Sequence, residues 1–278
     1  MYLKSLIILK LKSIFSHLRK SVIGSYVTAV LCETEQGVFL VDASDMSVGR
    51  KLSYKGEYDV AEINFLNQFI NADSSVLIIG THVGSLLIPI ARKVKKIVGY
   101  EANPKTFYFL KTNIILNFIE NTVINNLAVG DSNGQIEFYA NTINSGGSKI
   151  KPKKDSYLYN YDKPNIISVP MVSLDNHLNG SDTTFDLIIM DIEGAEYFAL
   201  KGMQNILANS QYLYIEYVPH HLSNVANVTN DEFLILIMPY FKTLKIFGED
   251  NYYEISESKK ILYALKSKNI SADLLFSK

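Results

Sequence analysis

The stretch SVLIIGTHVGSLLIPIARKVKKIVGYE, residues 75–101, decides the fold of this chain. Residues 76–79 form a short apolar, mostly β-branched run that stops at Gly80, which is typical of a buried strand. A turn of small residues then leads into a segment of helical character, and a second apolar run ends in an acid, Glu101. This order of strand, tight turn, helix and strand predicts the βαβ unit of nucleotide-binding α/β folds.

The turn after Gly80 is the first candidate binding site. Glu101 follows Gly80 by 21 residues, close to the spacing of about 20 at which an acid accepts hydrogen bonds from a ribose. The pattern G-x-G-x-x-G is incomplete, because His82 replaces its middle glycine and only Gly80 and Gly84 remain. Two interpretations therefore stay open, a nucleotide-binding turn and an ordinary turn of a parallel sheet.

Composition restricts the class of protein. The chain has 278 residues, 47% of them hydrophobic, which suits one large or two small globular domains. Its net charge of −1 argues against a general nucleic-acid binder, so we expect no nucleic-acid partner. The single cysteine, Cys32, excludes an intrachain disulfide and fits a reducing compartment, which predicts a cytoplasmic protein.

Residues 1–20 carry five basic side chains and no acid, and their apolar residues recur along one side of a helix. The apolar run is too short and too charged to span a bilayer. Three roles remain open: a helix docked on the domain, a dimer contact, or a helix lying on an anionic membrane surface. The prediction thus allows a peripheral membrane contact through residues 1–20, and it leaves the oligomeric state undefined.

The rest of the chain predicts one main domain, residues 71–278, with an N-terminal extension, residues 1–70, packed on it. The extension contains a predicted hairpin over residues 25–41 and a predicted helix over residues 58–70. In the main domain, strands alternate with helices, which indicates a mainly parallel sheet covered on both faces.

Two segments of the main domain break this alternation. Residues 141–170 are irregular and rich in lysine and tyrosine, and we interpret them as a long loop that either holds a sugar or anionic acceptor or is simply solvated. Near the C-terminus, residues 244–247, 252–255 and 261–265 predict a closing antiparallel ribbon.

Several motifs occur in a fixed order after the glycine turn. They are E101-A-N-P104, N126-L-A-V-G-D131, V172-S-L-D175, M190-D-I-E-G-A-E196 with L200-K-G202, and Y214-I-E216. Over roughly residues 35–220 this series resembles the FkbM family of S-adenosylmethionine-dependent methyltransferases. The family commonly has an acid two residues before the first glycine and Asn at the third turn position, where this chain has Ile78 and His82.

The resemblance implies a Rossmann-like class I methyltransferase fold with a seven-stranded sheet, mainly parallel with an antiparallel C-terminal ribbon. It implies S-adenosylmethionine as cofactor and methyl transfer to a hydroxyl of a sugar, glycan or small metabolite. The cofactor-binding residues that it implies are Gly80, Thr81, His82, Gly84, Glu101, Ala102, Leu127 and Ala128, with Glu101 on the ribose and Leu127 and Ala128 beside the adenine.

The predicted catalytic residues are Asp191, Glu193 and His220. Asp191 and Glu193 would lie on the acceptor side, where they would either contact the acceptor or jointly hold a divalent cation; the prediction includes no metal. Asp191 could instead cap the following helix. His82, His220 and His221 are candidate bases, because the pKa of histidine lies near neutral pH.

Two other functions stay open. A glycine turn with a distal acid also occurs in NAD-linked oxidoreductases, although that class leaves the D-x-E-G motif without a role. The replacement of an acid by Ile78 also permits a non-catalytic Rossmann-like binding module.

Overall fold

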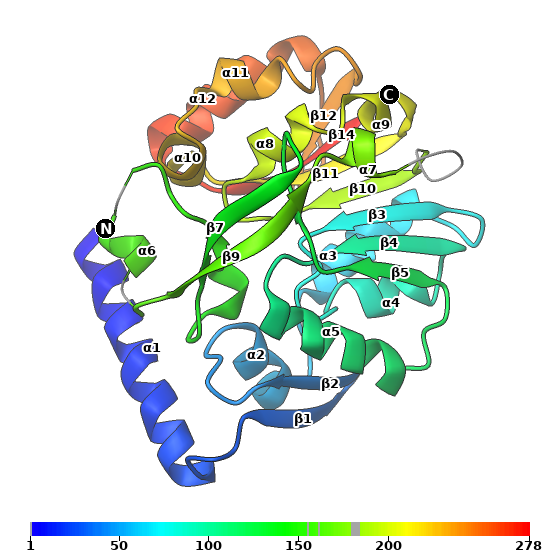
Figure 1. Cartoon of the computed structure of the whole chain (residues 1–278). Helices are drawn as coiled ribbons and strands as arrows, with labels where there is room; N and C mark the ends of the chain where they lie inside the picture. The colour runs from blue at the N-terminus through cyan, green and yellow to red at the C-terminus, as the bar shows by residue number, and fades with distance from the viewer. Residues whose placement is uncertain (1, 155, 161, 179–183) are drawn as a thin grey trace.

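The structure is a computed structural model that describes residues 2–154, 156–160, 162–178 and 184–278. Its centre is an eight-stranded sheet in the order β13-β12-β14-β11-β10-β3-β4-β5 (Figure 1). The strands of this sheet are β3 (Ser75–Ile79), β4 (Lys96–Tyr100), β5 (Thr122–Asn125), β10 (Leu187–Met190), β11 (Tyr212–Tyr217), β12 (Thr243–Ile246), β13 (Tyr252–Glu254) and β14 (Ala272–Ser277).

The sheet confirms the predicted class of fold. β5, β4, β3, β10 and β11 are parallel, and β14 enters between β11 and β12, antiparallel to both. Counted from the β5 edge, this is the mainly parallel arrangement with an antiparallel C-terminal ribbon. The predicted strand number of seven is wrong, because β13 pairs with β12 and adds an eighth strand at the edge.

The predicted strand over residues 261–265 is also wrong, since these residues belong to helix α12 (Ser258–Lys268). Leu262 is buried while Ile261 and Leu265 pack at the edge of the same core cluster, a helical spacing that short apolar runs do not distinguish from a strand. The third strand of the C-terminal ribbon is instead β14, in which Leu274, Leu275 and Phe276 are fully buried.

A second sheet takes up part of the long loop predicted over residues 141–170, because β8 and most of β9 fall within that range. It has four strands in the order β6-β9-β7-β8, namely β6 (Ala128–Val129), β7 (Gly134–Ala140), β8 (Lys149–Ile150) and β9 (Asn165–Val172). β7 and β9 pair antiparallel from Gly134 and Met171 to Ala140 and Asn165, and together they form the long ribbon in Figure 1. Pro170 hid this strand in the sequence, because proline inside an apolar run usually argues against a strand.

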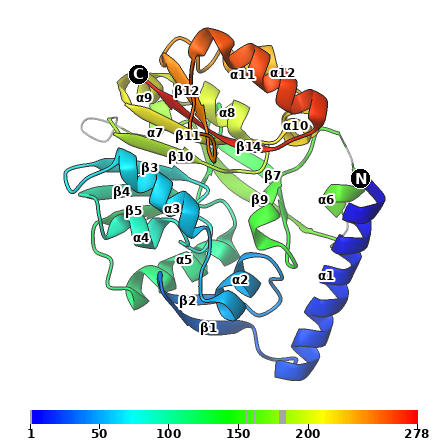
Figure 2. The ribbon, with the colours of Figure 1, turned by 180° about the vertical axis from the view of Figure 1, so that it is seen from behind.

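Helices cover both faces of the large sheet. Besides α12, the α-helices of the described residues are α1 (Tyr2–Ile23), α2 (Val48–Lys55), α3 (Val60–Leu66), α4 (Leu87–Ala91), α5 (Pro104–Leu116), α6 (Tyr157–Asn160), α7 (Leu174–His177), α8 (Glu196–Lys201), α9 (Gln204–Asn209), α10 (Pro219–His221) and α11 (Asn230–Leu234). Figure 2 shows α3 and α4 in front of the sheet, on the face opposite α8 and α9.

Strand β3 separates two hydrophobic cores. Leu77 and Ile79 belong to the core under α8 and α9, whereas Val76 and Ile78 belong to the core under α4 and α5. All four side chains are at most 1% exposed, which explains the uninterrupted apolar run that opens the βαβ unit. Ile78 therefore points into a core, away from any ligand bound at the strand ends.

The N-terminal hairpin of β1 (Ala29–Thr34) and β2 (Gly37–Asp42) shares the second of these cores. The Asn113 and Asn117 side-chain oxygens of α5 accept the backbone N–H groups of Leu40 (2.6 Å) and Val38 (3.0 Å). The hairpin is thus attached to α5 by hydrogen bonds as well as by apolar contacts. The boundary near residue 70 between extension and main domain stays a prediction.

Helix α1 lies at the outside of the molecule (Figures 1 and 2). The Ser16 hydroxyl donates to the Ser44 carbonyl (2.8 Å), and Arg19 donates to the Asp45 carbonyl and the Ser53 hydroxyl (both 3.3 Å). None of the described helices is long and apolar enough to cross a membrane. Residue 1, at the start of the predicted membrane-contacting segment, lies outside the described residues.

Candidate active site

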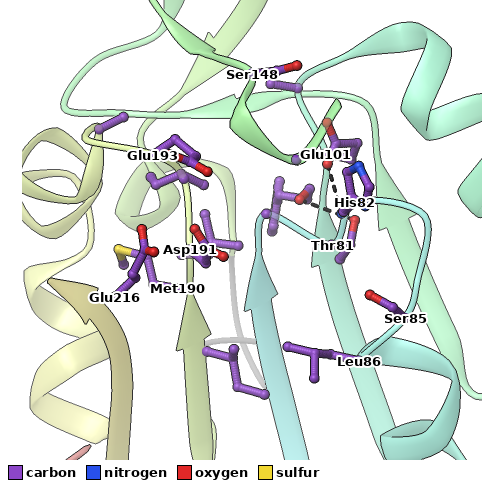
Figure 3. A pocket seen from close by; sticks show the side chains of 18 of the residues that line it. Thr81, His82, Ser85, Leu86, Glu101, Ser148, Met190, Asp191, Glu193 and Glu216 are labelled. Carbon is purple, nitrogen blue, oxygen red and sulfur yellow. Dashed lines mark hydrogen bonds between the residues drawn. The ribbon is translucent and has the colours of Figure 1, made fainter. Parts of the chain in front are cut away.

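A cavity of about 320 Å³ opens at the carboxyl ends of β3, β4, β10 and β11 (Figure 3). Parallel strands of open α/β sheets present their ligand sites at this edge. The predicted site residues that line the cavity are Gly80, Thr81, His82, Glu101, Ala102, Leu127, Ala128, Asp191 and Glu193. Gly84 and His220, also predicted, are not among the lining residues.

The glycine turn brings the backbone of β3 against β10. Gly80 has φ +92°, and a Cβ at this position would overlap the backbone oxygen of Asp191. The N–H groups of Gly80 and Thr81 both donate to the Tyr100 carbonyl, at 2.9 and 3.1 Å. Gly84, with φ +90°, donates to the Thr81 carbonyl (2.9 Å) and closes the turn from outside the cavity.

Glu101 holds the turn in place from the end of β4. Its carboxylate accepts the backbone N–H of His82 (2.9 Å) and that of Asn103 (2.8 Å). Figure 3 shows its side chain beside that of His82. Burial raises the pKa of Glu101 to about 7, against the two hydrogen bonds that favour its ionised form.

His82 occupies the position of the missing glycine, with φ +50°. Its Nε2 lies 2.8 Å from the Ser145 hydroxyl, which itself donates to the Asp45 carboxylate. Burial lowers the pKa of His82 to about 4, so the ring is neutral near pH 7. With so low a pKa the ring is a weak base, so it suits positioning better than proton abstraction.

The D-x-E-G-x-E motif forms the turn between β10 and α8. Glu196 closes this turn, because its Oε1 accepts the N–H groups of Ile192 (3.0 Å) and Gly194 (3.2 Å). Gly194 has φ +106°, and a Cβ there would press against Val225 at 2.6 Å. The alternative interpretation of Asp191 as a helix cap is wrong, since α8 starts after Ala195 without a side-chain cap.

The cavity is acidic. Its described lining contains no lysine or arginine, whereas seven acids line it: Asp59, Glu62, Glu101, Asp191, Glu193, Glu216 and Asp273. Burial raises the pKa of six of these carboxyl groups, Glu62, Glu101, Asp191, Glu193, Glu216 and Asp273. The cavity therefore favours a cationic ligand.

Four of these acids were missed as site residues in the sequence. Burial, aided by Asp273, raises the pKa of Glu62 to about 8, and burial raises that of Asp273 to about 6. Burial also raises the pKa of Glu216 well above its usual range, helped by Asp191. The available signal was an acid inside an apolar strand, as in Y-I-E216 and A-D273-L-L-F.

Asp191 and Glu193 both line the cavity, and their catalytic roles stay a prediction. Protein surrounds Asp191 on the strand side while its side chain stays exposed to the cavity. Burial, then the charges of Glu193 and Glu196, raises the pKa of Asp191 well above its usual range. A carboxylate with a raised pKa is a stronger base, so Asp191 is suited to accept a proton from a bound hydroxyl.

The two histidines after β11 differ in position. The ring of His220 stacks on Tyr159, with centroids 6.3 Å apart, outside the cavity lining. His221 lies against the site instead, with Nδ1 3.3 Å from the Glu193 carboxylate. Lys149 lies on the same carboxylate, with Nζ 3.6 Å from Glu193 Oε2.

Comparison with known proteins places the chain in a family. The methyltransferase FkbM domain model matches residues 79–244. A search of curated protein sequences finds no significant match. Among solved structures, the methyltransferase FkbM from Methylobacillus flagellatus KT is similar at 14% identity and TM-score 0.48, over 79% of this chain and 48% of that one.

Two other solved structures are similar to this chain, and the second is an rRNA methylase by name. Trm5b from Pyrococcus abyssi matches at 12% identity and TM-score 0.46, over 92% of this chain and 58% of that one. An rRNA methylase from Streptococcus thermophilus matches at 12% identity and TM-score 0.42, over 78% of this chain and 93% of that one.

This chain thus spans about half the length of the first two structures. The name of the rRNA methylase does not fit the expected absence of a nucleic-acid partner, which stays a prediction. The family model, however, covers more than half of the chain, and the chain therefore belongs to the methyltransferase FkbM domain family.

Proposed function

We propose that this protein is an S-adenosylmethionine-dependent methyltransferase that methylates a hydroxyl of a sugar, glycan or small metabolite. The observation that carries the proposal is the pairing of Glu101 with Asp191 in one acidic cavity, each at the end of a parallel strand. S-adenosylmethionine carries a sulfonium, an ammonium and only one carboxylate group, so its net positive charge suits this cavity.

The cofactor would lie across the glycine turn. The Gly80 and Thr81 backbone would approach it closely, Glu101 would accept hydrogen bonds from the ribose, and Leu127 and Ala128 would flank the adenine. Ile78 cannot take the amino end, because its side chain is in the core. We assign that end to the acids on the other side of the cavity, Glu62 and Asp273, which both line it.

Asp191 would act as the general base. When bound, S-adenosylmethionine would supply an activated methyl group on sulfur, and Asp191 would accept the proton that the acceptor hydroxyl releases as the methyl group passes to its oxygen. The products are the methyl ether and S-adenosylhomocysteine. Since the sulfonium is already activated, alignment of oxygen, carbon and sulfur supplies the rest of the rate enhancement.

The acceptor class follows from the charge of the cavity. A phosphate chain would be repelled by the lining acids, whereas a neutral or cationic hydroxyl compound would not. We therefore favour sugars and small metabolites over RNA, and RNA is the competing acceptor to be tested.

Calorimetry with S-adenosylmethionine, S-adenosylhomocysteine and NAD tests the proposal directly. We expect saturable binding of the first two and none of NAD. Binding of NAD alone would indicate an oxidoreductase, and no heat with any of the three would indicate a binding module of another kind. Labelled methyl transfer to a panel of sugars, amino sugars and total RNA then distinguishes the acceptor classes.

A further inference from the structure

We propose that Glu193, Glu216 and His221 form a binding site for a divalent transition-metal cation, with Mn²⁺ as the test ion. One oxygen of each carboxylate and one ring nitrogen of His221 all lie within 4.8 Å of one another. Ligand atoms about 2.1 Å from a metal are ~3 to ~4 Å apart, so a small closure of these side chains completes the site.

The three ligands come from three different elements that meet at one end of the cavity. Glu193 lies in the turn after β10, Glu216 is in β11, and His221 ends α10. Figure 3 shows Glu193 and Glu216 around the same space, with Asp191 between β10 and the cavity. The surrounding strands fix the spacing of the ligands, which is the preorganisation that a metal site requires.

His221 provides the evidence that this cluster is more than a group of acids. It is only 9% exposed, and its buried Nδ1 has no hydrogen-bond partner among the described residues. This nitrogen faces the Glu193 carboxylate at 3.3 Å without the geometry of a hydrogen bond. A buried nitrogen without a partner is costly, and coordination to a metal would satisfy it.

The donor set selects the kind of metal. Two carboxylates with one imidazole suit Mn²⁺, Fe²⁺, Co²⁺ or Zn²⁺, whereas Mg²⁺ and Ca²⁺ prefer oxygen ligands throughout. An oxygen-only group, Asp191, Glu196 and Glu216, also lies within 4.8 Å. Glu196 already holds the turn through its Oε1, so we place the cation on the His221 side.

Lys149 is the group that opposes the cation. Its ammonium lies 3.6 Å from Glu193 Oε2 and also donates to the Gly147 carbonyl. It compensates part of the acidic charge in the absence of a metal, and it would repel a divalent ion bound to Glu193. Removing this charge should therefore tighten metal binding, whereas removing a ligand should weaken it.

The cation would lie beside Asp191, on the side of the cavity assigned to the acceptor. Its open coordination positions would be available to an acceptor oxygen and would lower the pKa of the hydroxyl. This role rests on the proposed function, whereas the binding of the ion does not.

Binding of Mn²⁺ to the full chain, stripped with chelator, tests the site by electron paramagnetic resonance and calorimetry. We expect about one ion per chain, at least tenfold weaker binding in Glu216→Gln and His221→Gln, and severalfold tighter binding in Lys149→Met. His17→Gln and Glu120→Gln, exposed residues away from the cavity, are the matched controls and should bind Mn²⁺ as the wild type does.

Two outcomes would overturn the site: no saturable Mn²⁺ binding to the wild type, or equal affinity in His221→Gln and wild type. Circular dichroism and thermal melts show whether each variant is folded. If Glu216→Gln and His221→Gln are not folded, Lys149→Met tests the metal site, because unchanged Mn²⁺ affinity in that variant would contradict it. S-adenosylmethionine binding, measured without metal, fails only if the proposed function is wrong, so the two proposals are tested separately.

Discussion

Gly80, at the edge of the cavity, has no room for a side chain. Its φ of +92° and the contact with the Asp191 carbonyl together exclude any side chain. We expect Gly80→Ala to lower the free energy of unfolding by about 2–4 kcal/mol and to weaken S-adenosylhomocysteine binding, because the turn must move away from β10. Urea unfolding and calorimetry measure the two effects.

Gly134 is the matched control for this substitution. A methyl group added there would meet no other atom within 4 Å, and the backbone has no left-handed φ, so Gly134→Ala should change stability by less than about 0.5 kcal/mol. If the two substitutions had equal effects, neither the φ of Gly80 nor its contact with Asp191 would limit the side chain at this position.

Substitution of Asp191 is the most direct test of the proposed chemistry. We expect Asp191→Asn to reduce the rate of methyl transfer by about 10²- to 10⁴-fold, because the amide cannot accept the hydroxyl proton. Cofactor affinity should stay within about tenfold, since the cofactor's contacts are assigned elsewhere. The measurement is transfer of labelled methyl groups to the acceptor panel, beside calorimetry with S-adenosylhomocysteine.

An exposed acid outside the cavity serves as the control, and Asp250→Asn should retain full activity. Unchanged turnover in Asp191→Asn would remove this residue from the mechanism. If Asp191→Asn lost both activity and cofactor binding, Asp191 would instead be a cofactor-binding residue.

At the scale of elements, two of the motifs behind the family resemblance, S-L-D and L-x-G, have structural roles. The Asp175 carboxylate accepts the backbone N–H groups of Asn205 (3.1 Å) and Ile206 (3.3 Å) at the start of α9. The Ser173 hydroxyl donates to the Gly202 carbonyl (3.0 Å), and a Cβ on Gly202 would overlap the Gly130 carbonyl. The S-L-D and L-x-G motifs therefore bring β6, α8 and α9 together beneath the site.

Features encoded locally in the sequence could be predicted, and features created by tertiary packing could not. Apolar runs and fixed-spacing turns predicted the βαβ unit, the sheet class and the cavity edge with Glu101 and Asp191, because their causes are local in sequence. β9 was missed because Pro170 lies inside it, and the acids Glu62 and Asp273 were missed because tertiary packing brings them to the site. His220 was chosen over His221 because spacing along the chain does not show which ring of a pair faces inward.

Helix α1 has an apolar side that is exposed to solvent. Leu11, Ile14, Phe15 and Leu18 are each 46–55% exposed, on a helix that also carries Lys10, Lys12 and Lys20. We expect this protein to bind anionic phosphatidylserine vesicles more tightly than neutral ones, and Phe15→Asp to weaken that binding severalfold. Vesicle co-sedimentation measures the bound fraction.

Phe118, 90% exposed and outside α1, is the matched control for this experiment. If Phe118→Asp weakened vesicle binding as much as Phe15→Asp, the contact would not be specific to α1. Equal binding of neutral and anionic vesicles would argue against an electrostatic component.

For the whole molecule, the surplus of buried acid makes stability depend on pH. The raised pKa values of Glu62, about 8, and of Glu101 and Glu196, about 7, mean that these groups keep their protons in the folded state after the unfolded chain has lost them. Their contribution is fully present below about pH 4.5 and is lost as the pH rises through about 7 to 8. The histidines, whose pKa values burial lowers, act in the opposite direction mainly below about pH 6.5.

We therefore expect the ligand-free protein to be more stable at about pH 7 than at about pH 8.5, by about 1–2 kcal/mol in urea unfolding. Glu62→Gln should remove roughly half of this difference, because Glu62 has the highest of the three pKa values, whereas the exposed Glu120→Gln should leave it unchanged. Saturating S-adenosylmethionine should flatten the dependence, since a cationic ligand compensates the ionised acids. Greater stability at the higher pH would contradict this prediction, because it would mean that these acids are already ionised in the folded protein at about pH 7.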